Sequence, residues 1–267
     1  MIKKFTFNMR LFWQGASLSY VALFRWLTPI TYMASKIVSP LAQMIFFVVL
    51  GMYATGKDSA PFYVIGNAMQ ITAVSGIYGV TMSIGGDRWT GTLPYLFGTP
   101  ANRFFMFTGR ALVHILDGMI GVFIGFFWGV ALLGLDLNSA NPLALLITVL
   151  VTTLSTSGLG LLLGSLSLVS LNVMFVNNTV YFLLLLFSGA NVDLTKLPLW
   201  IQSFSNMLPL TRGIASARMI VNGASLGDVA PLLFQEFIMG MIYISLGYFL
   251  FRWFEMQAKR KGTLEAI

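Results

Sequence analysis

Ionisable side chains are scarce in the long apolar stretches of this sequence. His114 and Asp117 stand three residues apart, which places them on one face of a helix. Lys36 and Glu236 lie in two other apolar stretches. Charges inside a membrane are costly, so these residues are candidates for proton or substrate binding. The structural alternative is a mutually satisfied His114–Asp117 pair, Glu236 at a helix start and Lys36 reaching the membrane surface.

The sequence gives little support for nucleophilic catalysis, metal binding or nucleotide binding. The chain has no cysteine and one histidine, which excludes thiol catalysis and two-histidine zinc ligation within one chain. Residues 51–58 nearly match a phosphate-binding loop, but Asp58 replaces the Ser or Thr that would ligate Mg²⁺. They also follow an apolar helix instead of a strand. We therefore predict no catalytic residue, metal site or ATP site in this chain.

The stretch 87–103 mixes charged, glycine, proline and aromatic residues between two apolar segments. Leu93, Leu96 and Phe97 recur at helical spacing, which predicts a short amphipathic helix. The Thr99–Pro100 step predicts its end, because a residue before proline disfavours helical backbone. Such a helix at a membrane surface is a suitable contact for a soluble partner.

The elements that must position these residues are membrane helices. Hydrophobic residues make up 57% of the 267 residues and charged residues 9%, with a mean hydropathy of +0.82, whereas soluble domains carry roughly 25% charge. Apolar stretches long enough to cross a bilayer predict an all-α protein with six transmembrane helices, at about 29–52, 62–86, 111–134, 143–168, 172–190 and 232–253.

The distribution of basic residues predicts the orientation. Eleven of the sixteen Lys and Arg residues fall in the N-terminal segment, the 87–110 loop and the C-terminal tail. Positive charge favours the cytosolic side, so both termini and that loop are predicted to be cytosolic. This asymmetry also accounts for the net charge of +7, so no nucleic-acid partner is needed. The basic start Met1–Lys4 lacks the features of a cleaved signal peptide.

Two amphipathic regions flank the predicted spans. Residues 5–27 favour an N-terminal helix lying in the membrane interface, or alternatively a frayed cytosolic extension. Prolines interrupt 191–231, whose apolar pieces are too short to span and indicate outer re-entrant segments. The predicted single permease domain, 1–267, is therefore divided as 1–28 interfacial helix, 29–86 helices 1 and 2, 87–104 cytosolic loop, 105–190 helices 3 to 5, 191–231 re-entrant region, and 232–267 helix 6 and tail.

Small and polar residues mark faces of the predicted helices. Glycines at spacing four, which let helices approach closely, indicate packing within one subunit or a dimer seam; they are Gly121, Gly125, Gly129, Gly160 and Gly164. Asparagines and hydroxyls on predicted helices 4 and 5 either line a polar cavity or bond back to helix carbonyls; they are Asn172, Asn177, Asn178, Thr152, Thr153, Ser155, Thr156 and Ser157.

With these motifs in this order, the chain resembles the ABC-2 type permeases of ATP-binding-cassette exporters. The family's loop after helix 2 has a charged run, Gly-Thr-Leu, an aliphatic pair and Thr-Pro. The matching residues here are Asp87, Arg88, Gly91, Thr92, Leu93, Leu96, Phe97, Thr99 and Pro100. A second likeness is Leu197–Gln202 followed by Leu208–Thr211 and Arg218. Trp89, Pro94 and Arg212 depart from the family's pattern.

The resemblance implies a permease in a bacterial inner or plasma membrane, and not an enzyme. Two such chains, identical or related, would pair within the lipid, and separate ATPase subunits holding ATP and magnesium would dock on the 87–103 loop. The implied function is export of an amphipathic or lipid-like substrate: a drug, a peptide antibiotic or a lipid-linked glycan. The alternative is an ion-coupled secondary transporter or channel that needs no ATPase partner.

Overall fold

The structure is a computed structural model that describes residues 2–26, 28–89, 91–168 and 172–261. Every regular element in those residues is a helix, in agreement with the predicted all-α class. In chain order they are α1 (Ile2–Trp26), α2 (Pro29–Met33), η1 (Ala34–Val38), α3 (Ser39–Thr55), η2 (Lys57–Ser59), α4 (Ala60–Ala73), η3 (Val74–Gly79), α5 (Val80–Trp89), α6 (Leu93–Gly98), α7 (Arg103–Leu133), α8 (Pro142–Leu166), α9 (Val173–Phe187), η4 (Leu194–Lys196), α10 (Leu199–Ser205), α11 (Thr211–Val221) and α12 (Leu226–Lys261).

Four helices in the described residues are long and apolar enough to cross a membrane: Pro29–Thr55, Arg103–Leu133, Pro142–Leu166 and Leu226–Gln257. The second predicted span lies in α4, η3 and α5, where the π-helix η3 interrupts the regular turns. The fifth corresponds to α9, whose 15 residues rise only about 22 Å, against roughly 30 Å of hydrocarbon. Of the six predicted spans, four therefore correspond to described helices that are long and apolar enough to cross a membrane.

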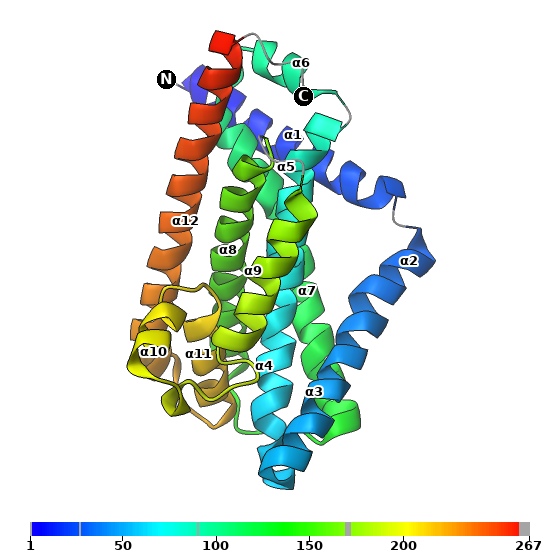
Figure 1. Ribbon diagram of the computed structural model, residues 1–267, viewed down its shortest axis with the longest axis vertical. Coiled ribbons are helices and arrows are strands. Elements are labelled where there is room, and N and C mark those ends of the chain that lie inside the picture. Colours follow the sequence, from blue (N-terminus) through cyan, green and yellow to red (C-terminus); the bar gives the residue numbers. More distant parts are fainter. Residues whose placement is uncertain (1, 27, 90, 169–171, 262–267) are drawn as a thin grey trace.

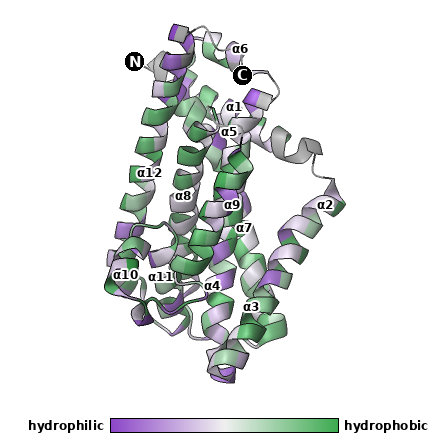
Figure 2. Cartoon of the chain, in the orientation of Figure 1, coloured by the Kyte–Doolittle hydropathy of each residue, from purple (hydrophilic) through white to green (hydrophobic). Residues whose placement is uncertain are grey.

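The two ends of the helix bundle carry different elements (Figure 1). Near the N-terminus lie α1, α6 and the C-terminal end of α12, whereas α10 and α11 lie at the opposite end. Hydrophobic residues dominate the long helices between these ends (Figure 2). The sixth predicted span, 232–253, is contained in α12, which begins at Leu226 and is 36 residues long. Glu236 is therefore inside this helix and not at its start, contrary to the sequence prediction.

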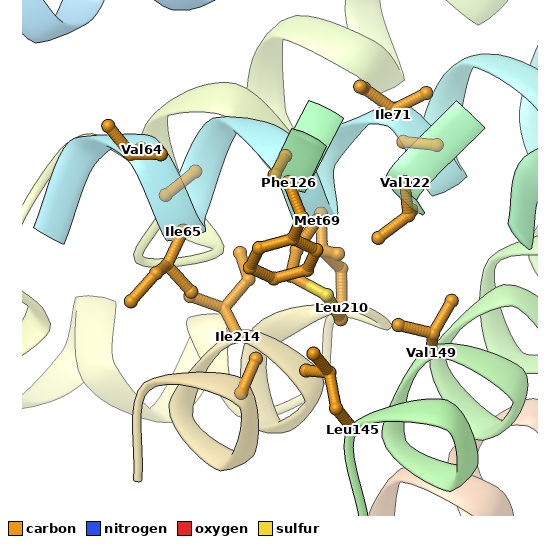
Figure 3. Close-up of a cluster of buried hydrophobic side chains, with 14 of the residues drawn as sticks. Val64, Ile65, Met69, Ile71, Val122, Phe126, Leu145, Val149, Leu210 and Ile214 are labelled. Atoms are coloured by element: carbon orange, nitrogen blue, oxygen red, sulfur yellow. The ribbon is translucent and has the colours of Figure 1, made fainter. Parts of the chain in front are cut away.

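A large part of the core lies where α4, α7, α8 and α11 meet (Figure 3). Its side chains come from α4, α7, α8, α11 and the residue before α11, and include Val64, Ile65, Met69, Val122, Phe126, Leu145, Val149, Leu210 and Ile214, each 9% exposed or less. Burying a large aliphatic or aromatic side chain contributes about 1.5–3 kcal/mol where water is the alternative solvent. This cluster fixes α11 against the spanning helices.

Glycines allow the closest helix contacts within this one chain. A Cβ built on Gly129 would lie 2.5 Å from Val64 Cγ1, and one on Gly121 would lie 2.7 Å from Ile71 Cγ2. Gly125 likewise faces Ile71 and Ala68 of α4. On α8, Gly160 faces the carbonyl of Gly76, and Gly164 faces Ile84. The predicted glycine faces thus lie between helices of the same subunit.

Helix α1 crosses one end of the bundle and packs on α7. A Cβ on Gly109 would lie 2.4 Å from the carbonyl oxygen of Phe12. The Ser19 and Ser83 hydroxyls are 2.8 Å apart, which links α1 to α5. Large side chains on the other face of α1 are exposed, including Trp13 and Leu18. This arrangement suits a helix in the membrane interface, where one face is apolar.

Candidate functional site

Helix α6 follows the sequence prediction closely. It spans Leu93–Gly98 and ends where Thr99 becomes extended before Pro100. Phe97 is 3% exposed and its ring contacts that of Phe251 on α12, with centroids 5.8 Å apart. Leu96 is half-buried on the same side, and the side chain of Leu93 lies outside the described part of the structure. Tyr95 is 79% exposed. One face of α6 is therefore fixed to the bundle and the other is open.

The turn before α6 is built by the predicted polar residues. Thr92 donates its backbone N–H to the Asp87 carbonyl at 2.9 Å, and its hydroxyl lies 3.2 Å from the Asp87 carboxylate. Gly91 has φ of +67°, a conformation that favours glycine. Asp87 also forms an ion pair with Arg110 on α7, and Arg88 donates to the Ser167 carbonyl after α8 at 3.2 Å. The turn is thus attached to α7 and α8.

Arg103 connects the end of this segment to α12, a role that the sequence analysis missed. Its guanidinium donates to the carbonyls of Phe97 and Thr99 at 2.9 Å, and to Glu255 Oε1 at 3.0 Å. Glu255 is 1% exposed and also pairs with Arg252 and Lys259. The signal available in the sequence was the spacing of Arg252 and Lys259, three residues before and four residues after Glu255, which marks this glutamate as a centre of ion pairs.

The buried charges pair differently from the prediction. Asp117 pairs with Lys36 from η1 and accepts hydrogen bonds from Tyr32 at 2.8 Å and Ser75 at 2.7 Å. Neither ring nitrogen of His114 has a hydrogen-bond partner among the described residues. The predicted mutual pair is therefore wrong, because a lysine ammonium is a stronger partner for the carboxylate than an imidazole. Lys36 also points inward instead of reaching the membrane surface.

The predicted asparagine and hydroxyl side chains of α8 and α9 differ in their hydrogen bonds. Thr152 and Thr153 donate to their own helix at 2.7 and 2.6 Å, so they line no cavity through free hydroxyls. Asn178 accepts from the Tyr78 hydroxyl at 2.7 Å. Asn177 is fully buried, and Asn172 begins α9. The predicted bonding of hydroxyls back to helix carbonyls is therefore met by Thr152, Thr153 and Thr156, but not by the buried Ser155 and Ser157.

A cavity of about 190 Å³ lies between the first span, α4 with η3, and α9. The Tyr181 hydroxyl at its wall donates to Gln43 at 2.8 Å. The side chains around it are uncharged and mostly polar; they are Ser35, Ser39, Pro40, Gln43, Asn67, Ile71, Val74, Tyr78 and Tyr181. The cavity can therefore hold an uncharged group that forms hydrogen bonds.

Arg218 of α11 binds the connecting segments at the end of the bundle opposite α6. Its guanidinium donates to the carbonyls of Phe62 and Gly189 at 2.9 and 2.8 Å and stacks 3.5 Å from the centre of the Phe62 ring. Hydrogen bonds from the Thr195 hydroxyl and backbone lower the pKa of the nearby Asp193 carboxyl. These contacts join α11, the segment after α9 and the start of α4.

The near-match to a phosphate loop is not built as one. Residues 51–55 finish α3, Gly56 turns the chain with φ of +98°, and Lys57 and Asp58 are exposed in η2. A phosphate loop instead follows a strand and opens a helix with its amides. Within the described residues, no three His, Asp or Glu side chains gather as metal ligands.

Comparison with known families matches residues 16–222 to the ABC-2 type transporter model. The match covers most of the chain, including the first spans, α6 and α11. Comparison with curated proteins and with solved structures finds no match. The resemblance carried by the 87–103 motif is confirmed, and the apolar helices make the chain a multi-pass membrane protein. The chain therefore belongs to the ABC-2 type transporter family.

Proposed function

We propose that this chain is the permease subunit of an ATP-driven exporter, with α6 as the contact for a separate ATP-binding subunit. The observation that carries the proposal is the two-sided character of α6: Phe97 is buried against α12 while Tyr95 is exposed. A helix that both presents an aromatic side chain and is anchored to a spanning helix can pass a partner's movement into the bundle. ATP and magnesium would be held by the partner.

The proposed assembly has two permease chains in a bacterial inner or plasma membrane. Each chain would cross six times, with the α4–η3–α5 helix and α9 as the two spans beyond the four apolar helices. Both termini and α6 would face the cytosol. Exposed apolar side chains on α9, such as Phe175 and Phe182, suit either lipid or the second chain.

The substrate is proposed to be amphipathic or lipid-like: a drug, a peptide antibiotic or a lipid-linked glycan. The cavity between the first span, α4 and α9 supports a cargo whose hydrogen-bonding part is uncharged, since no charged residue lines it. The exposed apolar surface around it, including Phe46 and Phe182, suits the lipophilic part. A fixed charge on the cargo would lack a partner there.

Co-purification tests the proposal. Tagged chain extracted in mild detergent should recover an ATP-binding subunit. Tyr95→Ala should weaken that complex at least tenfold, because tyrosines are often dominant contacts in protein interfaces. Tyr53→Ala is the matched control, since Tyr53 is 90% exposed near the other end of the bundle, on α3. Equal recovery with both variants would refute the role of α6.

The alternative is ion-coupled transport, favoured by the buried Lys36–Asp117 pair and by His114, whose ring nitrogens have no hydrogen-bond partner within the described part of the chain. Reconstituted chain with and without its ATPase distinguishes the two. Export of cargo that requires ATP supports the exporter, whereas cargo movement by the chain alone under a proton or sodium gradient supports the alternative.

A further inference from the structure

Two fully buried glutamates lie near opposite ends of α12. Glu236 is 0% exposed and Glu255 is 1% exposed. At about 1.5 Å rise per residue they are roughly 28 Å apart along the helix. Each carboxylate binds a segment outside α12, and the two segments belong to opposite ends of the bundle (Figure 1). This placement needs an explanation beyond local packing.

At the α6 end, Glu255 acts through Arg103. The Arg103 guanidinium makes hydrogen bonds to Glu255 and to the carbonyls of Phe97, Thr99 and Ala101, the last at 3.3 Å. The carbonyls at the C-terminal end of α6 and the loop after it are therefore bound by one side chain. Phe251, one turn before Glu255, adds its ring contact with Phe97. Arg103 and Phe251 thus join the C-terminal end of α6 to α12.

At the other end, Glu236 binds the start of α11. Leu210, the residue before α11, has φ of +84° and donates its N–H to Glu236 Oε1 at 2.6 Å. Positive φ is unusual for a branched aliphatic residue, so the turn needs support from outside. Leucine has no side-chain oxygen to cap a helix, and no side-chain cap is present at this position. Glu236 of α12 accepts the N–H of Leu210 itself, which is one of the donors at the start of α11 without a partner in that helix.

Between its two ends, α12 is one continuous helix packed tightly on α8. A Cβ on Gly240 would lie 2.9 Å from the Cα of Ser155, and one on Gly247 would lie 2.8 Å from the backbone nitrogen of Leu162. Pro231 precedes Glu236, so the stretch joining the two glutamates contains no proline. A continuous helix transmits displacement along its axis, whereas a hinge would absorb it.

We propose that α12 carries the displacement of α6 to α11. Arg103, at the start of α7, and Glu236, in the first third of α12, are the positioning residues at the two contacts. The inference rests on the proposed function, since it names how the ATPase partner's movement would cross the membrane. In this mechanism the α6 end of α12 follows α6 through Arg103. The other end then moves the start of α11 through Glu236, and with it the segment that closes that end of the bundle.

The experiment measures distances between spin labels, which the absence of native cysteine makes direct. The complex of the full chain with its ATP-binding subunits is placed in lipid nanodiscs. One labelled cysteine pair, at Gly98 and Leu132, follows α6, and a second pair, at Ala215 and Leu132, follows α11. Each pair is measured without nucleotide and after trapping with ATP and vanadate. ATP hydrolysis and thermal melting are recorded for every variant.

In the unaltered chain both pairs should change on trapping. Arg103→Lys keeps a charge for Glu255 but cannot bind all the α6 carbonyls, so the α6 pair should still change while the α11 pair stays fixed. Glu236→Leu should have the same effect, and Glu236→Gln, which retains an acceptor for the Leu210 N–H, should restore the α11 change. ATP hydrolysis should continue in both Glu236 variants, which lie far from α6.

Matched controls lie beside each positioning residue. Arg252 pairs with Glu255 but is 40% exposed, and among the described residues it has no hydrogen bond to the α6 segment, so Arg252→Gln should leave both changes intact. Phe234 lies two residues before Glu236 and is 64% exposed, so Phe234→Ala should behave likewise. These controls separate the proposed linkage from a general loosening of the two helix ends.

The distance measurements can overturn the role of α12 alone, or the role of α12 together with the proposed function. An α11 change that persists in Arg103→Lys and Glu236→Leu, or that is absent from the unaltered complex while the α6 pair responds, overturns the role of α12 and leaves the proposed function standing. Failure of the α6 pair to respond in the unaltered, assembled complex overturns the proposed function together with the inference. Restoration by Glu236→Gln would exclude simple misfolding as the cause of the loss in Glu236→Leu.

Discussion

A charged side chain buried in the bundle needs an opposite charge and hydrogen bonds to offset the loss of water around it. Asp117 illustrates this, because its two oxygens accept from Tyr32, Ser75 and Lys36, which come from two neighbouring helical segments. Removing one partner of a buried ion pair leaves an uncompensated charge, whereas replacing both with apolar residues of similar size is often tolerated. The pair therefore contributes specificity of packing between the first span and α7.

The difference between removing one partner and replacing both predicts how variants of the Lys36–Asp117 pair behave. Asp117→Leu should destabilise the chain by about 3–5 kcal/mol, because Lys36 would remain buried without a counter-charge. The double variant Lys36→Met with Asp117→Leu should recover most of that loss. Reversible unfolding in mixed detergent micelles measures both. A double variant no more stable than Asp117→Leu would contradict this account of the pair.

At the scale of helices, packing distance is set by glycine. Gly160 on α8 faces the carbonyl oxygen of Gly76, which a built Cβ would approach to 1.9 Å. The π-helix η3 contains Gly76 and brings its backbone against α8. A backbone carbonyl cannot rotate away as a flexible side chain can. An added methyl group must therefore separate the two helices.

Gly160→Ala should consequently lower stability by about 1–3 kcal/mol, the usual cost of overpacking a tight contact. Gly86→Ala on α5 is the matched control, because a Cβ there meets no atom within 4 Å. That substitution should leave stability equal or slightly higher, since alanine favours helix more than glycine does. Thermal melting of both variants tests the contrast. Equal melting temperatures would show that α8 and η3 adjust freely.

The sequence predicts elements better than it predicts partners. Apolar length located the long helices, and the Thr99–Pro100 step located the end of α6, because both signals are local. The Lys36–Asp117 pair joins residues 81 positions apart, and the Arg103–Glu255 pair joins residues 152 positions apart. Such pairings depend on how helices pack, which hydropathy does not encode. The same limit explains why His114 was assigned the wrong partner.

For the whole molecule, the structure places α1, α6 and the end of α12 together at one end of the bundle (Figure 1). Eleven of the sixteen lysines and arginines lie in α1, the 87–110 stretch around α6 and the end of α12, and four lie toward the opposite end. Because cytosolic segments are enriched in positive charge, this end is expected to face the cytosol. The expectation is independent of the family and of any partner.

Single cysteines test this orientation without interference, since the chain has none of its own. Lys57→Cys and Lys196→Cys, at exposed positions opposite α6, should react with a membrane-impermeant maleimide in intact cells. Tyr95→Cys on α6 should react only after the membrane is permeabilised, and a permeant maleimide should label all three. Labelling of Tyr95→Cys in intact cells, with the two lysine positions protected, would reverse the orientation. A cytosolic ATPase could then no longer reach α6, so this measurement also decides whether the proposed coupling is physically possible.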